Sequence, residues 1–289
     1  MKDFTLVICT FKRHFLIEAC LKSVLSGSMM PNKIIIVDQN YDYLTYDKII
    51  NLFKNKKFYN YQIIRNLIKK GLTRSKNISL KHINSKYIFF LDDDIILDKK
   101  YLSRNIELIF KKKAHAVCGV ISNYEKSYFK NFIYLMFNFS IFRDNRYFFI
   151  NYKKLLTKPT YEIFQVPGGI TFYDSRIFKK TSFDDKYITH NYEDVEFNIR
   201  LRKLFKKPKL FINLKTLAHD KLSRETKENF NLRIYFMTLL YLKNKGIKNF
   251  ISYIATLSGY LLSSIPTYKI KYFIDLRKNI KKAISKAKN

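Results

Sequence analysis

The feature that most restricts the fold is a series of short apolar runs, rich in Ile, Val, Leu and Phe, that alternate with segments of helical spacing. Apolar runs without polar alternation are typical of strands buried on both faces, and helices between such strands cover those faces. The first third of the chain therefore predicts an α/β fold with a mostly parallel sheet flanked by helices. The expected strands span residues 4–10, 33–38, 61–65 and 86–91, and the expected helices span residues 16–25, 46–53 and 71–83.

The pattern changes in the middle of the chain. A helix at 101–112 and a strand at 114–122 continue the series. Residues 124–159 then crowd aromatic side chains among Lys, Arg and Asn without a clean period, so we interpret them as an excursion that flanks the site or touches a membrane surface. Core-like residues resume at 163–213.

The C-terminal part is helical and basic. Helical spacing begins at Asn229, with breaks near Gly246 and Pro266, and the last expected helix, Lys269 to Lys288, is apolar on one side and basic on the other. We therefore expect an α/β unit over 1–225 and a helical, basic extension over 226–289.

Three consecutive aspartates, Asp92, Asp93 and Asp94, follow the fourth expected strand. Adjacent carboxylates repel one another, and a divalent cation with a diphosphate offsets that repulsion because hard cations prefer oxygen ligands. The carboxyl ends of strands in open α/β sheets are also where ligands bind. A solvated turn is the plain alternative for this motif taken alone.

Other polar clusters stand where strands stop or helices begin. In a parallel sheet the strand ends share one edge, so a single crevice could collect a base-binding acid, a metal-binding acid and a catalytic acid. The clusters are Thr10 to Arg13, Asp38 to Asn40, Gly168 and Gly169, Glu193 and Asp194, and His219 and Asp220.

Composition restricts the partners and the compartment. The formal charge of +32 over 289 residues favours polyanions such as phosphorylated substrates, anionic lipid or nucleic acid, although AT-rich coding would also enrich Lys. The three cysteines have no paired spacing, which is typical of reduced thiols in a cytoplasmic protein. We see no secretory signal and no unbroken apolar stretch long enough to cross a bilayer.

Several motifs in this order resemble family 2 glycosyltransferases of the GT-A fold, over about residues 4 to 220. They are Val7-Ile8-Cys9-Thr10-Phe11-Lys12-Arg13, Ile36-Val37-Asp38, Gly71-Leu72-Thr73-Arg74-Ser75-Lys76-Asn77, Phe90-Leu91-Asp92-Asp93-Asp94 and Glu193-Asp194-Val195-Glu196-Phe197. The resemblance implies a GT-A-like catalytic domain at 1–225, with a nucleotide-binding part at about 1–122 and an acceptor part at about 160–225.

The resemblance also implies roles for the donor-binding residues. Thr10 and Arg13 would line the nucleotide pocket, and Asp38 would accept a hydrogen bond from the pyrimidine ring of the nucleotide. Arg74 would face the nucleotide or its phosphates.

The aspartate cluster would bind ribose and metal. By the same resemblance, Asp92 or Asp93 would contact the ribose and Asp94 would ligate Mg²⁺ or Mn²⁺. His219 matches the downstream histidine that helps to bind metal or diphosphate.

The remaining motifs would face the reacting groups. Gly169 and Glu193 are expected to bind substrate, and Asp194 is expected to be the general base. Glycosyl transfer needs the departing diphosphate neutralised and the acceptor hydroxyl deprotonated, which a bound metal and a carboxylate can do. One base without a carboxylate nucleophile predicts inversion at the anomeric carbon, by analogy with glycosidases.

Two other functions remain as alternatives. A nucleotidyltransferase can share the sheet and the acidic ligands, but it should carry a Gly-rich loop after the first strand, where this chain has Thr10 to Arg13 without glycine. A basic nucleic-acid-binding protein should gather its basic residues on one face, whereas here lysines occur throughout the sequence.

The expected partners are a nucleotide-sugar donor and a saccharide or lipid-linked acceptor. The last helix and the uncharged run Asn249 to Pro266 predict docking on an anionic membrane surface, because an amphipathic basic helix lies in the membrane interface. We therefore expect a cytoplasmic enzyme, peripheral on the inner face of the cell membrane, that serves polysaccharide or glycolipid synthesis.

Overall fold

The structure is a computed structural model. It describes residues 3–11, 13–40, 46–68, 71–123, 128–186, 192–221, 227–264 and 275–288. The strands are β1 (Phe4–Thr10), β2 (Lys33–Asp38), β3 (Tyr61–Arg65), β4 (Tyr87–Asp92), β5 (Ile95–Leu97), β6 (Ala116–Ile121), β7 (Thr160–Glu162), β8 (Ile170–Asp174) and β9 (Leu210–Asp220). The α-helices are α1 (His14–Leu25), α2 (Tyr46–Asn55), α3 (Leu72–Leu80), α4 (Tyr101–Lys112), α5 (Tyr128–Phe137), α6 (Arg146–Asn151), α7 (Glu193–Phe205), α8 (Lys227–Lys243), α9 (Ile247–Ser264) and α10 (Leu276–Lys288).

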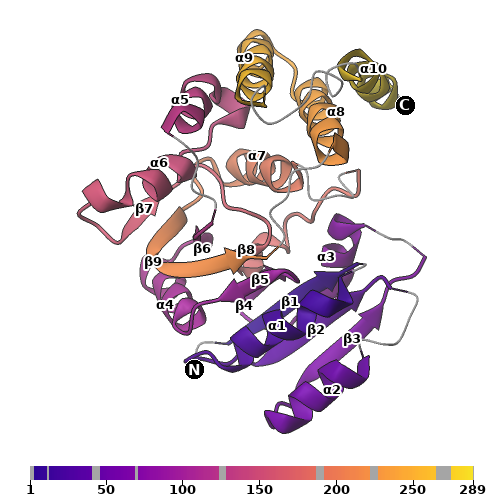
Figure 1. Ribbon diagram of the computed structural model, residues 1–289, viewed down its shortest axis with the longest axis vertical. Coiled ribbons are helices and arrows are strands. Elements are labelled where there is room, and N and C mark those ends of the chain that lie inside the picture. Colours follow the sequence, from indigo (N-terminus) through magenta and orange to yellow (C-terminus); the bar gives the residue numbers. More distant parts are fainter. Residues whose placement is uncertain are drawn as a thin grey trace.

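One mixed sheet of nine strands, counted over the described residues, forms the centre of the molecule (Figure 1). Its order is β3-β2-β1-β4-β8-β6-β9-β5, and β7 pairs with β9. The strands from β3 to β4 are parallel, as the sequence predicts. Beyond β4 the sheet is mixed, because β8 runs antiparallel to both β4 and β6 while β9 runs parallel to β6.

These directions bring distant segments to one edge of the sheet. Because β8 is antiparallel to its two neighbours, β6 and β9 run in the same direction as β1, β2 and β4. The carboxyl ends of β1, β2, β4 and β9 and the amino end of β8 therefore lie at one edge. This edge carries the polar clusters that the sequence singled out.

The two faces of the sheet are buried by different helices. Phe89 and Phe172 stack on each other, with ring centroids 4.4 Å apart, in the core that includes side chains of α1, α2 and α4. The next residues along the two strands, Phe90 and Tyr173, belong to the core on the opposite face, which includes side chains of α7. This alternation follows from the two-residue period of a strand, and burial on both faces explains the continuous apolar runs.

The C-terminal helices pack on one another and on α7. Phe236, Met237 and Leu240 of α8 form a buried cluster with Val195 and Ile199 of α7. The cluster also includes Phe142, which follows α5, and Tyr253 of α9. Residues 128–142 and 227–264, far apart in the sequence, therefore contribute to one helical layer, as Figure 1 shows.

The apolar side of α10 is used inside the protein. Leu276 and Ile280 pack against Phe230 and Ile234 of α8, and Asn279 donates a hydrogen bond to Asn231 at 2.8 Å. The first six residues of the expected last helix, 269–274, lie outside the described residues, as do Pro266 and the expected boundary at 225/226. Among the helices described, none combines the length and the apolar character needed to cross a bilayer.

Candidate functional site

The strand register places the first three clusters side by side. Thr10 at the end of β1 is paired with Asp38 at the end of β2, and Cys9 is paired with Asp92 at the end of β4. The backbone N–H of Gln39 donates to the carbonyl oxygen of Thr10 at 3.0 Å, which extends the pairing past the strand ends. The structure thus brings together residues from positions 10, 38 and 92.

Asp38 lies in a small buried network at this edge. Its Oδ1 accepts hydrogen bonds from the backbone N–H and the side-chain amide of Asn40, at 2.9 and 2.7 Å. Its Oδ2 is buried and has no hydrogen-bond partner among the described residues. A buried acceptor without a donor is unusual in a native protein, so Oδ2 fits a donor group of a bound ligand.

The start of α3 lies next to this network. Gly71 has a φ of 139°, which favours glycine, and its N–H donates to Gln39 Oε1 at 2.5 Å. Arg74 lies in the first turn of α3 and is half-buried. The amino end of α3 therefore lies at the same edge as Asp38.

Asp93 and Asp94 are buried and share one cation. Arg13 Nη1 lies 2.6 Å from Asp94 Oδ2 and 3.5 Å from Asp93 Oδ1. Burial raises the pKa of Asp93 to about 6, although Thr10 and Arg13 act against that rise. Burial, and then the charge of Asp92, raises the pKa of Asp94 to about 7. The cluster thus carries more negative charge than Arg13 offsets, and it favours a further cation.

The backbone of Gly169 lies directly against the Asp92 carboxylate. It comes just before β8, where its carbonyl oxygen accepts a hydrogen bond from Asp92 N–H at 2.9 Å. A Cβ at position 169 would lie 1.8 Å from Asp92 Oδ2 and 2.1 Å from Asp92 Cγ. Only a residue without a side chain allows this carboxylate to lie against the backbone.

Glu193 and Asp194 open α7 on the other side of the Gly168–Gly169 loop. Tyr192 caps the helix in the left-handed conformation, with φ 61°, and Asp194 Oδ1 accepts from the Val195 N–H at 2.8 Å. Glu193 Oε1 lies 3.8 Å from the Nζ of Lys76, which also donates to the carbonyl oxygen of Gly168 at 3.2 Å. Lys76 therefore joins α3 to the start of α7.

Burial and neighbouring charges shift the pKa values of both carboxyl groups of this pair. Burial, then the charge of Asp194, raises the pKa of Glu193 to about 8. Burial also raises the pKa of Asp194, but Arg146 and the Val195 N–H act against that rise. Of two neighbouring acids, one can hold a proton while the other is ionised. Burial favours a proton on this pair, and Arg146 and the Val195 N–H favour placing the negative charge on Asp194.

Arg146 reaches the site from the aromatic segment. Its guanidinium forms a two-pronged pair with Asp144, with Nη2 2.7 Å from Oδ2 and Nε 3.0 Å from Oδ1. Asp144 is buried, Arg146 is largely buried, and Tyr134 Oη donates to Asp144 at 2.9 Å. This part of the 124–159 excursion thus flanks the start of α7.

His219 and Asp220 end β9 at the same edge. Asp220 is buried, and its charge is among those that raise the pKa of Asp94. His219 precedes it, is exposed, and has Nδ1 3.5 Å from Ser122 Oγ. Since side chains alternate along a strand, His219 and Asp220 lie on opposite faces of β9, with Asp220 on the side of the carboxylate cluster.

The described residues fit a metal ion that takes some of its donor atoms from a bound substrate. No group of three or more His, Cys, Asp or Glu side chains in the described part of the chain is arranged to hold an ion by itself. Mg²⁺ and similar cations often use one or two carboxylates and take their other ligands from substrate phosphates and water. The crowded, buried carboxylates of Asp93 and Asp94 are donors of that kind.

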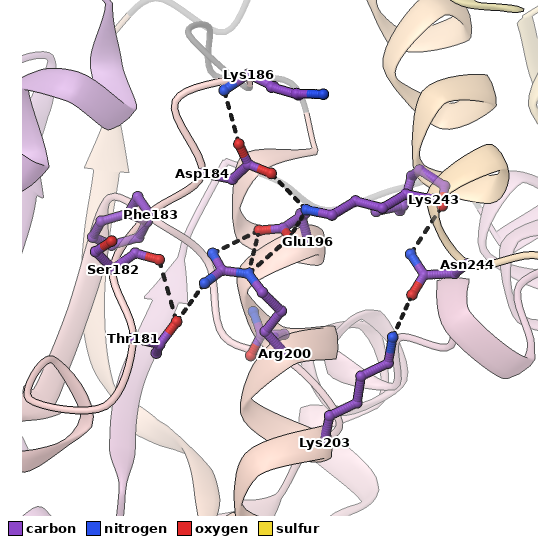
Figure 2. Close-up of polar contacts among 12 residues, drawn as sticks. Thr181, Ser182, Phe183, Asp184, Lys186, Glu196, Arg200, Lys203, Lys243 and Asn244 are labelled. Atoms are coloured by element: carbon purple, nitrogen blue, oxygen red, sulfur yellow. Dashed lines mark hydrogen bonds and ion pairs between the residues drawn. The ribbon is translucent and has the colours of Figure 1, made fainter. Parts of the chain in front are cut away.

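A second polar network ties α7 to the C-terminal helices (Figure 2). The buried carboxylate of Glu196 accepts from Arg200 Nε at 2.8 Å and lies 2.6 Å from the Nζ of Lys243 on α8. Lys243 also pairs with Asp184 at 2.5 Å. Helix α8 is thereby fixed to the helix that begins with Glu193 and Asp194.

This sheet, with an acidic cluster at the carboxyl end of β4 and helices on both faces, is the fold of GT-A glycosyltransferases. The model of the family "Glycosyl transferase family 2" matches residues 5–182, and the chain belongs to that family. This membership supports a glycosyltransferase over the nucleotidyltransferase and the nucleic-acid-binding protein. No curated protein matches the sequence.

Solved structures of low sequence identity share the fold. One is the mannosyltransferase PcManGT from Pyrobaculum calidifontis in complex with GDP-Man and Mn²⁺, with a TM-score of 0.62 and 12% identity over 98% of this chain and 80% of that chain. Another is S. aureus TarS 1–349 in complex with UDP-GlcNAc, with a TM-score of 0.60 and 13% identity over 99% and 80% of the two chains.

Three residues of the site have no assigned role in the sequence-based prediction. Lys76 lies inside one of the family-like motifs, but nothing in the sequence indicates that it is buried between α3 and α7. Arg146 lies in a segment without a period, and Asp220 follows the histidine to which the family resemblance assigns a role. Of the three, only Asp220 has a signal in the sequence that could have indicated a site residue, because it is an acid at the end of a strand.

Proposed function

We propose that this protein is an inverting, metal-dependent glycosyltransferase that moves a sugar from a nucleotide-sugar donor to a hydroxyl group of a saccharide or lipid-linked acceptor. The observation that carries the proposal is the convergence of Asp38, Asp92 to Asp94, Gly169, and Glu193 with Asp194 at one sheet edge. Family membership supports the reaction class.

The donor would bind across the carboxyl ends of β1, β2 and β4. Asp38 offers a buried, unpaired acceptor for an N–H of the nucleobase. Thr10 and Arg74 line the same edge, and Asp92 or Asp93 would accept from the ribose hydroxyls. Gly169 allows that approach because it leaves the Asp92 carboxylate in place.

The metal site would use Asp94. His219, exposed at the end of β9 on the face opposite Asp220, would reach the diphosphate only from the solvent side. A bound Mg²⁺ or Mn²⁺ would supply Lewis-acid stabilisation of the leaving diphosphate. Arg13, which holds Asp94 at 2.6 Å, is placed to contribute positive charge to the same group. The Mn²⁺ in the PcManGT complex supports this choice of metal.

Asp194 would be the general base. Burial raises the pKa of both carboxyl groups, and Arg146 and the Val195 N–H act against that rise at Asp194, which favours the ionised form there. A neutral Glu193 can donate a hydrogen bond to a substrate hydroxyl while Asp194 accepts the proton of the attacking one. A single base of this kind supports inversion at the anomeric carbon.

The proposed setting is a cytoplasmic protein, peripheral on the inner, anionic face of the cell membrane, in polysaccharide or glycolipid synthesis. The large positive charge and the basic α10 support it. We also propose the division into a catalytic unit at 1–225 and a helical extension at 226–289.

The experiment is a panel of UDP-, GDP- and dTDP-sugars with Mn²⁺, scored for thermal stabilisation and for slow donor hydrolysis. We expect one nucleotide class to stabilise the protein and its sugar to be released, and we expect both effects to disappear in Asp94→Ala. If no member of the panel binds, or if Asp94→Ala binds and hydrolyses the donor as well as the native chain, the proposal is wrong.

A further inference from the structure

Helix α9 presents an apolar stripe to solvent. Its side chains recur at helical spacing, so they share one face of the helix. Figure 1 shows α9 at the end of the molecule opposite α2. The stripe, called the α9 stripe below, and the exposed fraction of each residue are Ile247 (73%), Phe250 (44%), Ile251 (53%), Ile254 (44%) and Leu262 (46%).

The opposite face of α9 is fixed to the protein, so the stripe cannot turn inward. Gly259 lies so close to α5 that a Cβ there would be 2.6 Å from Phe137 Cβ. Thr256 donates to the carbonyl oxygen of Phe137 at 3.2 Å, and the ring of Tyr253 stacks on Tyr241 of α8 with centroids 5.0 Å apart. The exposure of the stripe is therefore a property of the packed structure.

Helix α5 adds further apolar surface next to α9. Phe132 and Met136 are one helical turn apart and are 60% and 62% exposed. Together with the α9 stripe, they place several large exposed apolar side chains on two neighbouring helices, which differs from single apolar residues scattered over a surface. A cluster of this kind marks an interaction site.

The charges of these helices define the partner. Helix α10 carries six basic residues and no acidic residue, and α5 and α9 add one lysine each and again no acid. An apolar surface among basic side chains is complementary to an anionic bilayer, which attracts each Lys or Arg and accepts apolar side chains below the headgroups. A second copy of this chain fits less well, because it would bring two formal charges of +32 together.

We propose that the α9 stripe, with Phe132 and Met136, is the surface by which this protein docks on an anionic lipid bilayer. This deepens the membrane association of the proposed function and changes its basis. The sequence pointed to the apolar side of the last helix together with the uncharged run Asn249 to Pro266, but Leu276 and Ile280 of α10 are used against α8, so the apolar contact comes from α9 and α5. Helix α10 would contribute its lysines instead.

Docking on this surface would orient the site. Tyr253 of α9 packs on α8, and Lys243 of α8 is paired with Glu196 of α7 (Figure 2). The bilayer would therefore lie in a defined position relative to Glu193 and Asp194. A lipid-linked acceptor would reach the base from the membrane surface.

The test is co-sedimentation of the full-length protein with vesicles, in the absence of donor. We expect the native chain to bind vesicles of phosphatidylcholine and phosphatidylglycerol at low salt and to stay in the supernatant with phosphatidylcholine alone. Ile251→Asn with Ile254→Asn should weaken binding by at least about tenfold, because two apolar side chains no longer enter the interface. Ile68→Asn, an equivalent change at a 94% exposed site after the edge strand β3, should leave binding unchanged.

Several results would overturn the proposal. The native protein could remain in the supernatant with anionic vesicles, or the double variant could bind as well as the native chain. Light scattering could also show that the native chain is a dimer and the double variant a monomer. Thermal unfolding of both variants verifies that they fold. If the protein binds vesicles through the α9 stripe but no donor binds, the transfer reaction is wrong and the docking surface stands.

Discussion

The close approach of Gly169 to Asp92 makes a sharp prediction for Gly169→Ala. The new Cβ would lie 1.8 Å from Asp92 Oδ2, whereas ordinary contacts begin at 3.4 Å, so the carboxylate would have to retreat by about 1.5 Å or more. The backbones of residues 92 and 169 cannot move apart easily, because the Asp92 N–H donates to the Gly169 carbonyl oxygen at 2.9 Å. The Asp92 side chain would move instead.

Both stability and turnover should fall. Overpacking of this kind typically lowers the free energy of unfolding by about 1–3 kcal/mol. Misplacing a substrate-binding group by about 1 Å can reduce kcat/KM by about 10²-fold. The measurements are urea denaturation of the free protein and steady-state kinetics with the donor that the panel identifies.

A double-mutant cycle isolates the cause. The three nearest atoms to the new Cβ all belong to the Asp92 side chain. In an Asp92→Ala background, Gly169→Ala should therefore cost less than about 0.5 kcal/mol, as expected for non-interacting changes. Gly168→Ala is the neighbouring comparison, because the closest atoms to its Cβ would be the side-chain ends of Glu193 and Lys76, at 2.9 Å, with Asp194 Cβ at 3.7 Å. An equal cost of Gly169→Ala in both backgrounds would refute the reasoning.

Four further predictions follow from the site and from α7. Asp94→Ala, or EDTA on the native chain, should abolish transfer while the unfolding midpoint stays within a few degrees; full activity in EDTA would exclude the metal. Asp194→Asn should lower kcat by about two to four orders of magnitude with donor binding retained, and near-native turnover would move the base elsewhere. Because the folded-state pKa of Glu193 is raised from 4.5 to about 8, the folded state binds the proton more tightly, so the free energy of unfolding should fall as pH rises from about 4.5 to 8. Urea denaturation across that range should show a shallower fall for Glu193→Gln, and identical profiles would contradict the assignment. Lys243→Met should lower the free energy of unfolding by about 1–3 kcal/mol, because Glu196 then keeps Arg200 as its one ion-pair partner among the described residues; the control Lys248→Met, on the exposed side of α9, should change it by less than about 0.5 kcal/mol.

Much of the N-terminal half was predictable from local patterns. The expected bounds of β1, β2, β3 and α4 agree with the structure. Strands β1 and β2 are buried on both faces and are therefore largely apolar, β3 is a partly buried edge strand, and α4 has a regular apolar face. Strand β5 was not predicted, since its three residues are too few to show a period. The antiparallel insertion of β8 depends on pairing with β4 and β6, which no local pattern encodes.

The candidate site divides in the same way. The aspartates, the glycine pair and the Glu-Asp pair could be predicted, because the ends of strands and the starts of helices can be recognised in the sequence. Their surroundings were not visible: the buried ion pair of Lys76, the approach of Arg146 and the burial of Asp220 come from segments distant in sequence.

The clearest difference is in the C-terminal helices. Sequence periodicity showed that α10 is amphipathic and that residues 249–266 are uncharged, but amphipathicity states only that one side seeks an apolar partner. The tertiary structure decides which partner each helix has. Helix α8 covers the apolar side of α10, whereas the packing of α9 on α5 and α8 leaves its Ile and Phe stripe in solvent. Local patterns determine which residues are apolar, but whether such a surface is buried depends on contacts between segments that only the folded chain brings together.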